Sequence, residues 1–411
     1  MIYNPTIQQP LKTGELTVFQ NGEYLPSSYK CDVFTKVNVS LKIIKLATPT
    51  VIQKSNYVAV VHDNDVWANE FEFYVDNTLV LTTSTPYADL HEILPESGSG
   101  SVFARVKYSQ GMVGSSNFSN TIVCGIQDYA DCVVELNDDT VRVVRLADGE
   151  DSMHVTIPPY ALIEGKFFPI TEIGENAFAG NTTMETVGGA FIERIYKGAF
   201  KGASLLTSIN FPYLKEIYGS EVFSGTRLTQ LKLQKLSRFY APEFLKNNVS
   251  PTSVLLPQTA YYDAILPHTF DGTKINYLFT PSNVKRIDEN AFVGSSLKYL
   301  EIKSDNVDIS KNAFSGSDLK TQNGYVFVRF NDLAKYLSDE YASTFGNLAC
   351  TLDVEYQEEF IGTKTIASKT CKFRLFYNYS DLPTENNPIN VSGENWISEG
   401  NLTLYAKITV E

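Results

Sequence analysis

The sequence predicts a mainly β chain, in which a β-sandwich is followed by a capped repeat solenoid and a small C-terminal β domain. Three observations predict it: short alternating segments from Thr48 to Val123, a sevenfold repeat from Ile173 to Gly316, and strict alternation near the C-terminus. The length of 411 residues is enough for several domains with cores of their own. The expected boundaries are 1–46 for an N-terminal arm and strands, 47–126 for the sandwich, 127–349 for the solenoid with its caps, and 350–411 for the C-terminal β domain.

The N-terminal arm begins with Met1 to Pro10, which are polar, bounded by proline and without periodicity. Chain ends are ordered only where something holds them. We therefore expect this arm to dock onto other copies of the chain or onto neighbouring subunits of an assembly. Further along, Val37, Val39, Leu41 and Ile43 alternate as in a strand, which either starts the sandwich or pairs elsewhere.

Regular β spacing marks the next segment. Polar turns at Asp76-Asn77 and from Ser97 to Gly100 separate runs in which apolar and polar residues alternate. The expected strands are Tyr57 to Val61, Glu70 to Val75, Thr78 to Thr82, Val102 to Tyr108 and Asn117 to Val123. Such spacing over about 80 residues is typical of a β-sandwich.

The repeat consists of an apolar residue, four or five further residues, and then a phenylalanine that a small residue and glycine usually follow. The seven phenylalanines step by 22, 23, 21, 26, 22 and 22 residues, at Phe178, Phe200, Phe223, Phe244, Phe270, Phe292 and Phe314. A Leu-x-x-Leu-x-Leu segment then predicts a short strand, and the Asn-Ala-Phe piece predicts a turn or helical fragment. One unit of roughly 22 residues cannot bury its own apolar face, so neighbouring units must stack into a solenoid.

These repeats resemble a known family. The phrases ITEIGENAFAG, VKRIDENAFVGSSLKYLEI and VDISKNAFSGSDLK are similar to the BspA-like leucine-rich repeats of bacterial surface proteins, some protist proteins and phage-encoded proteins. The lead-in from Val155 to Ile170 and the exit, Tyr325 to Val328 followed by a helical-looking segment from Leu333 to Phe345, also resemble that family. Around Phe244 the alanine and glycine of the repeat are missing, and the 26-residue step to Phe270 implies an insertion. These departures leave the register of the fourth and fifth repeats open.

The sandwich also has a resemblance. Its phrases FEFYVDNTLV, PYADLHEIL and SVFARVKYS resemble a fibronectin type III domain, which implies a spacer or a binding module. Related immunoglobulin-like sandwiches have the same appearance.

The C-terminal β domain is predicted from alternation at period two, which marks half-buried strands. The alternating residues are Leu352, Val354 and Tyr356, then Cys371, Phe373, Leu375 and Tyr377, and finally Leu402, Leu404, Ala406, Ile408 and Val410.

Composition excludes several functions. A net charge of -13 and a pI near 4.9 argue against nucleic acid, which needs clustered Lys and Arg. No stretch is apolar enough to span a membrane, and no secretory signal is visible at the N-terminus. The five cysteines lack zinc-site spacing and are expected to be buried thiols: Cys31, Cys124, Cys132, Cys350 and Cys371.

The sequence contains none of the common catalytic or metal-binding motifs, such as H-E-x-x-H, G-x-S-x-G or G-x-x-x-x-G-K-[ST]. The histidines are scattered and have no partner at ligand spacing: His62, His91, His154 and His268. Asp63, Asp65 and Glu70 lack the order of a calcium loop and are interpreted as a solvated loop. We therefore expect no enzyme activity, no metal and no cofactor.

The strongest candidate for function is the concave face of the solenoid, where alternate strand residues point outward. The candidate binding residues are Ser208, Asn210, Gln230, Lys232, Tyr277, Phe279, Tyr299 and Glu301. Tyr277, Phe279 and Tyr299 form the best candidate contact patch, because exposed aromatic rings are typical interface anchors. The alternative is that the C-terminal domain covers these rings or that they pack on one another.

The leading hypothesis is a non-enzymatic structural or binding protein of a phage virion surface, either a capsid decoration or a tail-associated protein, since such a protein needs no export signal. The alternative is a bacterial cell-surface adhesin that binds a host protein or glycan. A carbohydrate-active accessory protein is the third hypothesis, because a linear sequence with 47 acidic residues cannot exclude a catalytic carboxylate pair. The expected partner is a protein or glycan on a cell surface.

Overall fold

The computed structural model describes most of the chain in two units, which divide after Asp128. Each unit is described by itself. The described residues are 19–20, 23–24, 46–62, 68–108, 114–233, 235–250, 253–259, 261–341, 343–352, 363–376, 380, 383–384 and 404–410. The predicted arm from Met1 to Pro10 and the predicted strand from Val37 to Ile43 lie outside these residues.

The first unit contains two antiparallel sheets around one apolar core. One sheet has the order β3 (Thr50–Lys54), β4 (Tyr57–Val61) and β7 (Tyr87–Asp89), and the other has the order β6 (Thr78–Thr83), β5 (Glu70–Val75), β8 (Ser99–Lys107) and β9 (Ile122–Gly125). Val51 and Val58 from the first sheet share a buried cluster with Phe71, Phe73 and Val102 from the second. The remaining described elements of this unit are α1 (Leu90–Ile93) and the pair β1 (Phe19–Gln20) and β2 (Glu23–Tyr24).

The predicted strands Tyr57 to Val61 and Glu70 to Val75 are confirmed with their bounds, whereas β8 begins inside the predicted turn at Ser99. The assignment of this unit to the fibronectin type III family stays a prediction.

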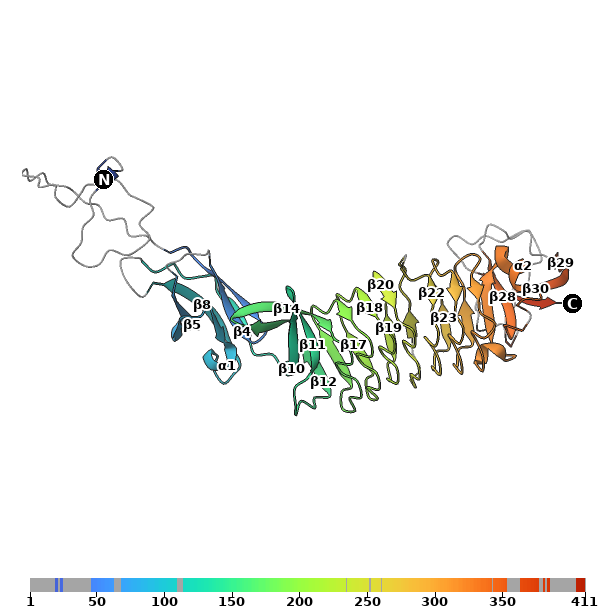
Figure 1. The fold of residues 1–411 in the computed structure, drawn as a ribbon, viewed down its shortest axis with the longest axis horizontal. Coiled ribbons are helices and arrows are strands. Elements are labelled where there is room, and N and C mark those ends of the chain that lie inside the picture. The colour runs from blue at the N-terminus through green and yellow to red at the C-terminus, as the bar shows by residue number, and fades with distance from the viewer. Residues whose placement is uncertain are drawn as a thin grey trace, which may run out of the picture. The chain divides into compact units, whose positions relative to one another are not determined.

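The second unit is a solenoid whose repeats contribute two rows of short strands, which are parallel except for two antiparallel pairings at the start of one row (Figure 1). The isoleucine row carries the isoleucine that opens most repeats. It comprises β10 (Cys132–Asn137), β11 (Thr140–Leu146), β14 (Lys166–Ile173), β16 (Arg194–Ile195), β18 (Glu216–Tyr218) and β20 (Arg238–Tyr240), with β13 (Tyr160–Ile163) paired to β14, and then a separate sheet of β22 (Ala264–Ile265), β24 (Arg286–Ile287) and β26 (Asp308–Ile309).

The leucine row carries the Leu-x-Leu segments and is interrupted twice. It comprises β12 (His154–Ile157), β15 (Thr186–Gly189) and β17 (Ser208–Asn210), then β19 (Gln230–Lys232) and β21 (Ser253–Leu255), then β23 (Tyr277–Phe279), β25 (Tyr299–Glu301) and β27 (Tyr325–Arg329).

A stack of buried phenylalanines joins the two rows along the solenoid core. The ring centroids of Phe178 and Phe200 lie 5.2 Å apart, as do those of Phe200 and Phe223 and those of Phe270 and Phe292. Each of these rings is at most 2% exposed. The repeat period is therefore set by the need to put one large ring per turn onto the ring of the turn before.

The turn around each ring also explains the glycines. Gly202, which follows Phe200 by two residues, has φ +69°, a conformation that glycine adopts without steric cost. The residue two positions before the ring also has positive φ, as at Gly198 and Glu221. In every repeat but the last, where Asn312 does not have positive φ, two left-handed positions thus bracket the buried ring.

The fourth repeat is shifted by one residue from the predicted register. The backbone N–H of Phe223 donates to the carbonyl of Phe244, where the other repeats have the residue before the ring, and the N–H of Leu245 donates to Thr269. Leu245 therefore occupies the ring position, and Asn247, at φ +59°, takes the place of the glycine. The prediction of Phe244 was wrong because a leucine fills this position while Phe244 packs edge-on against Phe223.

The C-terminal strands continue the leucine row. β28 (Asn347–Leu352) pairs in parallel with β27, and β31 (Leu404–Val410), β30 (Lys369–Phe376) and β29 (Thr363–Ile366) follow it as antiparallel strands. Cys350, Cys371 and Ala406 belong to the same buried core as Phe314. The segment predicted as a small C-terminal β domain thus shares the core of the solenoid in its described residues.

The predicted helix from Leu333 to Phe345 is much shorter in the structure. The α-helix α2 spans only Leu333–Tyr336, after the 3₁₀ turn η2 (Phe330–Asp332). The following residues form turns, with N–H groups of Tyr341 and Thr344 bonded three residues back. These turns bring Tyr341 and Phe345 against Tyr336, and this aromatic packing replaces further helix.

The expectation of buried thiols is confirmed at Cys124, Cys350 and Cys371, whereas Cys132 is half-buried and Cys31 lies outside the described residues. Burial raises the pKa of the Cys124 thiol to about 11. In the part of the chain that the structure describes, no helix has the length and apolar character needed to cross a membrane.

Replacing Phe200 by alanine is expected to destabilise the solenoid by about 3–5 kcal/mol, because it removes a fully buried ring that contacts a ring on either side. Urea unfolding followed by circular dichroism measures this loss. Tyr213→Ala is the control, since Tyr213 is 58% exposed and its loss should change stability by less than about 0.5 kcal/mol. Equal effects of the two substitutions would contradict the ring stack as the source of stability.

Candidate recognition surfaces

The eight predicted binding residues all lie on strands of the leucine row, at positions that flank a buried or half-buried aliphatic residue. Four of them are exposed: Ser208 and Asn210 on β17, and Gln230 and Lys232 on β19. The alternation of side chains across a strand thus correctly predicts which residues face outward in this half of the row.

The structure does not leave the predicted aromatic patch exposed. Tyr299 is only 9% exposed and Glu301 only 6%, while Tyr277 and Phe279 are half-buried. Tyr299 packs in a small outer cluster with Tyr325, Phe327, Ala349 and Phe376, against which Tyr277 and Tyr405 also lie. The expectation that Tyr299 and Glu301 face a partner was wrong, because rings from β27 and the C-terminal strands cover this part of the row.

Glu301 has partners within the chain instead. The hydroxyl of Tyr277 donates to its carboxylate at 2.6 Å, and the ammonium of Lys303 lies 3.8 Å away. The same ammonium lies 4.6 Å from the centre of the Phe279 ring. This end of the leucine row is therefore packed against other side chains of the chain, and the charged groups of Glu301 and Lys303 lie beside the packed rings.

The exposed half of the row contains a hollow of about 430 Å³, at the point where β17 and β19 are not paired. We call it the β17–β19 hollow. Its lining residues come from two successive repeats: Thr207, Ser208, Ile209, Asn210, Phe211, Pro212, Leu214, Thr229, Gln230, Leu231, Lys232, Leu233, Lys235 and Leu236. The four exposed candidates thus converge on one concavity, which the strand pattern did not predict.

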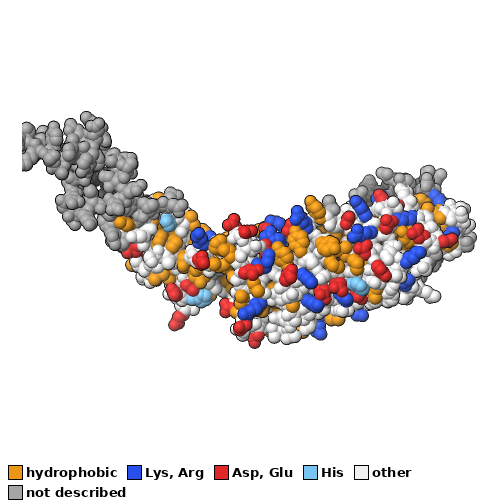
Figure 2. Space-filling view, viewed as in Figure 1, with side chains coloured by type: hydrophobic (Ala, Val, Ile, Leu, Met, Phe, Trp, Pro, Cys, Tyr) orange, Lys and Arg blue, Asp and Glu red, His pale blue; other side chains and the backbone are white. Residues whose placement is uncertain are grey.

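The isoleucine row carries a second set of polar residues that the sequence reasoning missed. The outward residue before each buried apolar residue alternates in charge, and registers pair Arg142 with Glu172, Glu172 with Arg194, Arg194 with Glu216 and Glu216 with Arg238. The signal was available as alternating Glu and Arg at a spacing of 22 residues. Charges of both signs are also interspersed over the solenoid face in Figure 2.

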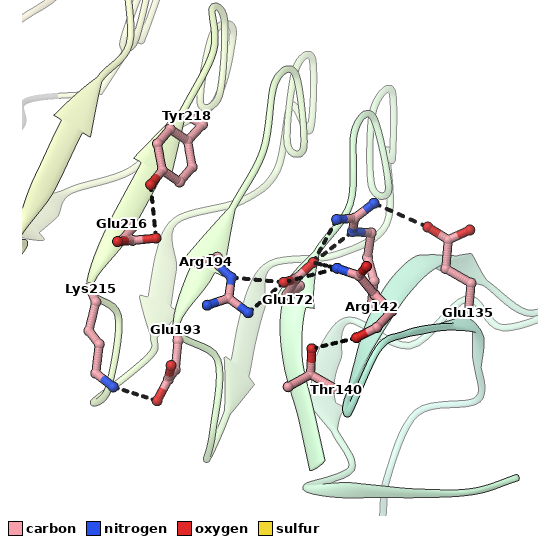
Figure 3. A network of polar contacts seen from close by, with 10 residues as sticks. Glu135, Thr140, Arg142, Glu172, Glu193, Arg194, Lys215, Glu216 and Tyr218 are labelled. Atoms are coloured by element: carbon pink, nitrogen blue, oxygen red, sulfur yellow. Dashed lines mark hydrogen bonds and ion pairs between the residues drawn. The ribbon is translucent and has the colours of Figure 1, made fainter. Parts of the chain in front are cut away.

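Glu172 is the centre of this charge ladder. Its carboxylate, 1% exposed, lies 2.7 Å from Arg142 and 2.6 Å from Arg194, and also accepts from Asn137 (Figure 3). Burial alone would raise the pKa of Glu172, but hydrogen bonds and charges from Arg194 and Arg142 outweigh it and keep the pKa below its usual value. Arg142 also lies 4.6 Å from the ring centre of Tyr196. We therefore interpret this fully paired carboxylate as a structural group and not as a catalytic one.

Among the described residues, no three His, Cys, Asp or Glu side chains could hold one ion together. His91 contacts Asp89 at 2.9 Å and His268 contacts Asp271 at 3.0 Å, each within its own turn. Asp63 and Asp65 lie outside the described residues.

Comparisons with known proteins concern the solenoid. Residues 166–250 and 263–323 match the BspA type leucine rich repeat region in six copies. The repeats within these two segments are therefore similar to leucine-rich repeats of that type. No curated protein matches the chain.

Several solved leucine-rich repeat structures resemble it. A leucine-rich repeat protein from Bacteroides ovatus is 18% identical, with a TM-score of 0.31, over 50% of this chain and 66% of that one. The T. pallidum leucine-rich repeat protein TpLRR is 19% identical, with a TM-score of 0.25, over 44% of this chain and 78% of that one. The pneumococcal vaccine antigen PcpA is 15% identical, with a TM-score of 0.26, over 44% of this chain and 65% of that one.

Glu172→Gln is expected to destabilise the solenoid by up to about 3 kcal/mol at pH 7, because it leaves two guanidinium groups, each 27% exposed, without their shared carboxylate. The folded pKa of Glu172 lies below the unfolded value, so its contribution is present above the unfolded pKa and is lost as pH falls through the folded pKa. Urea unfolding at pH 7 and at acidic pH should therefore show a difference between wild type and variant that shrinks on acidification.

Glu193→Gln is the matched control. Glu193 is 31% exposed and its partner Lys215 is 54% exposed, so water screens this pair and we expect a loss below about 1 kcal/mol. A loss at Glu172 as small as the loss at Glu193 would show that the charge ladder contributes no more than surface pairs.

Proposed function

We propose that this chain is a non-catalytic binding protein whose main contact region is the β17–β19 hollow. The observation that carries the proposal is the convergence of Ser208, Asn210, Gln230 and Lys232 on one exposed concavity. Proteins with BspA-type repeats are typically surface binding proteins, and a stacked solenoid offers rigid surfaces to its partners.

The lining of the hollow favours a glycan as ligand. Hydroxyl and amide groups of Ser208, Asn210 and Gln230 can donate to and accept from sugar hydroxyls. The half-buried ring of Phe211 offers an apolar wall, and Lys232 and Lys235 favour sugars that carry a negative charge. A volume of about 430 Å³ lies within the range of small-ligand sites, roughly 300–1,000 Å³.

Carriage on a phage virion remains our proposal for the biological context, with a bacterial cell surface as the alternative. Both contexts use the same binding function, since either particle or cell would present the solenoid to a glycan-bearing or protein-bearing surface. The N-terminal arm, which lies outside the described residues, is proposed as the attachment to other copies or neighbouring subunits.

The double variant Asn210→Ala with Gln230→Ala is expected to weaken glycan binding about tenfold or more, because each lost hydrogen bond is worth about 0.5–1.5 kcal/mol. A glycan array probed with the labelled full chain identifies the ligand, and titration calorimetry measures the loss. Lys285→Ala, exposed and on the isoleucine row, is the control that should bind as wild type does. Unchanged binding by the double variant would remove the hollow from the function.

Mass spectrometry of purified phage particles and of washed cell envelopes from the source culture tests the context. Stoichiometric amounts of the chain in virions are the expected result. Detection only in envelopes would overturn the virion proposal in favour of a cell-surface adhesin, and would leave the binding proposal intact.

A further inference from the structure

A cluster of three tyrosines and one arginine lies on the isoleucine row and in the turn before β22, away from the strands that form the β17–β19 hollow. We call Tyr218, Arg238, Tyr240 and Tyr261 the Tyr–Arg cluster. Tyr240 and Tyr261 are 63% and 69% exposed, whereas the phenylalanines stacked along the core are at most 2% exposed. The guanidinium carbon of Arg238 lies 5.4 Å from the centre of the Tyr261 ring, and its Nη1 donates to the Tyr218 hydroxyl at 3.3 Å.

The cluster arises from the fault between the fourth and fifth repeats. β20 ends the first sheet of the isoleucine row and β22 begins the next one, so the described strands of the row are not paired at this point. The buried ring of Tyr262 packs at 4.9 Å against Phe239 of β20, and the extra residues before it bring Tyr261 to Arg238. The longer spacing between the fourth and fifth repeats thus accompanies the contact of Tyr261 with Arg238 at the surface.

The charge ladder is incomplete at this position. Within the described chain, the carboxylate paired with Arg238 is that of Glu216 at 3.8 Å, much looser than the 2.6 Å contact between Glu172 and Arg194. Glu216 also accepts a hydrogen bond from Tyr218 at 2.9 Å. On β22 the corresponding position is held by Ala264, which is itself buried and precedes buried Ile265 as Arg238 precedes buried Phe239. No acidic side chain therefore follows Arg238 in the ladder.

The guanidinium group of Arg238 consequently has N–H donors that can bind a further carboxylate. Its side chain is 54% exposed, and a guanidinium group carries five N–H donors in a planar fork that fits one carboxylate with two parallel hydrogen bonds. The rings of Tyr240 and Tyr261 offer apolar surface to the groups that flank such a carboxylate.

We propose that the Tyr–Arg cluster docks a protein partner through an exposed Asp or Glu side chain, which takes the place of the missing acidic residue of the ladder. Charge complementarity selects the carboxylate, and the rings of Tyr240 and Tyr261 select a protein segment with apolar neighbours. Tyrosine and arginine are among the residue types enriched at the anchors of protein interfaces. Because the whole chain carries a net charge of -13, attraction to an acid has to be this local.

The test selects peptides on the full-length chain from a yeast-displayed library of random linear peptides, with counter-selection on the Arg238→Gln chain. We expect the selected peptides to share an Asp or Glu next to an apolar residue, and their affinity to fall at least about tenfold on Arg238→Gln. Arg238→Lys should restore only part of this loss, because an ammonium cannot form the two-pronged contact. Tyr261→Ala should weaken binding by a smaller factor, and added NaCl should weaken it further.

Arg286→Gln is the matched control, since Arg286 lies on the same row, is 52% exposed and already pairs with Asp288 at 2.9 Å. It should leave peptide affinity unchanged. Failure to enrich any peptide, enrichment of peptides without acids, or equal binding to Arg238→Gln would each overturn the proposal. Binding of an acidic glycan that depends on Arg238, without any selected peptide, would overturn it in favour of a carbohydrate.

The outcome is separable from that of the proposed function. The Asn210→Ala and Gln230→Ala double variant changes only the leucine row, so it should bind the selected peptides as wild type does. Loss of peptide binding in that variant would contradict a separate docking surface on the isoleucine row.

Discussion

The stacking of one buried ring per repeat is the interaction on which the rest of this solenoid depends. A single turn has two strands of two or three residues in most repeats, which is too little to fold alone, and its apolar residues are covered only by the turns before and after it. Phe200 illustrates this, because it is fully buried and its ring stacks on Phe178 of the preceding repeat and on Phe223 of the following repeat. Every outward residue inherits its position from this stack, including those of the hollow and the charge ladder.

The sequence predicts the stacked rings well because each repeat adds one ring to the stack, so the repeat period of the sequence is also the period of the packing. A strand position inside a repeat of about 22 residues determines whether a side chain points to the core or outward, so Asn210 and Lys232 are predicted correctly as exposed. The same rule fails at Tyr299, because its cover comes from β27 and from strands near the C-terminus that no repeat period describes. Long-range cover is a property of the fold, and a local pattern does not contain it.

Two other differences have local causes. The ring position of the fourth repeat is Leu245, and a search for phenylalanine finds its neighbour Phe244 instead. The residue with positive φ two positions after the ring marks the correct frame, but in the fourth repeat this residue is Asn247 and not the glycine that stands there in the other repeats. The hollow and the Tyr–Arg cluster both lie where the strand rows are interrupted. A sequence period describes the regular stacking of repeats and does not predict such interruptions.

The four strands after β27 have a consequence for how such an array can change its length. β28 continues the parallel order, but β31 and β30 reverse direction, and their residues close the core that the repeats would otherwise leave open. An additional repeat cannot simply be appended after this reversal, since its parallel strand would meet an antiparallel neighbour. Gene duplication can therefore lengthen the solenoid only by inserting units upstream of the reversal, where each copy finds an identical neighbour on both sides.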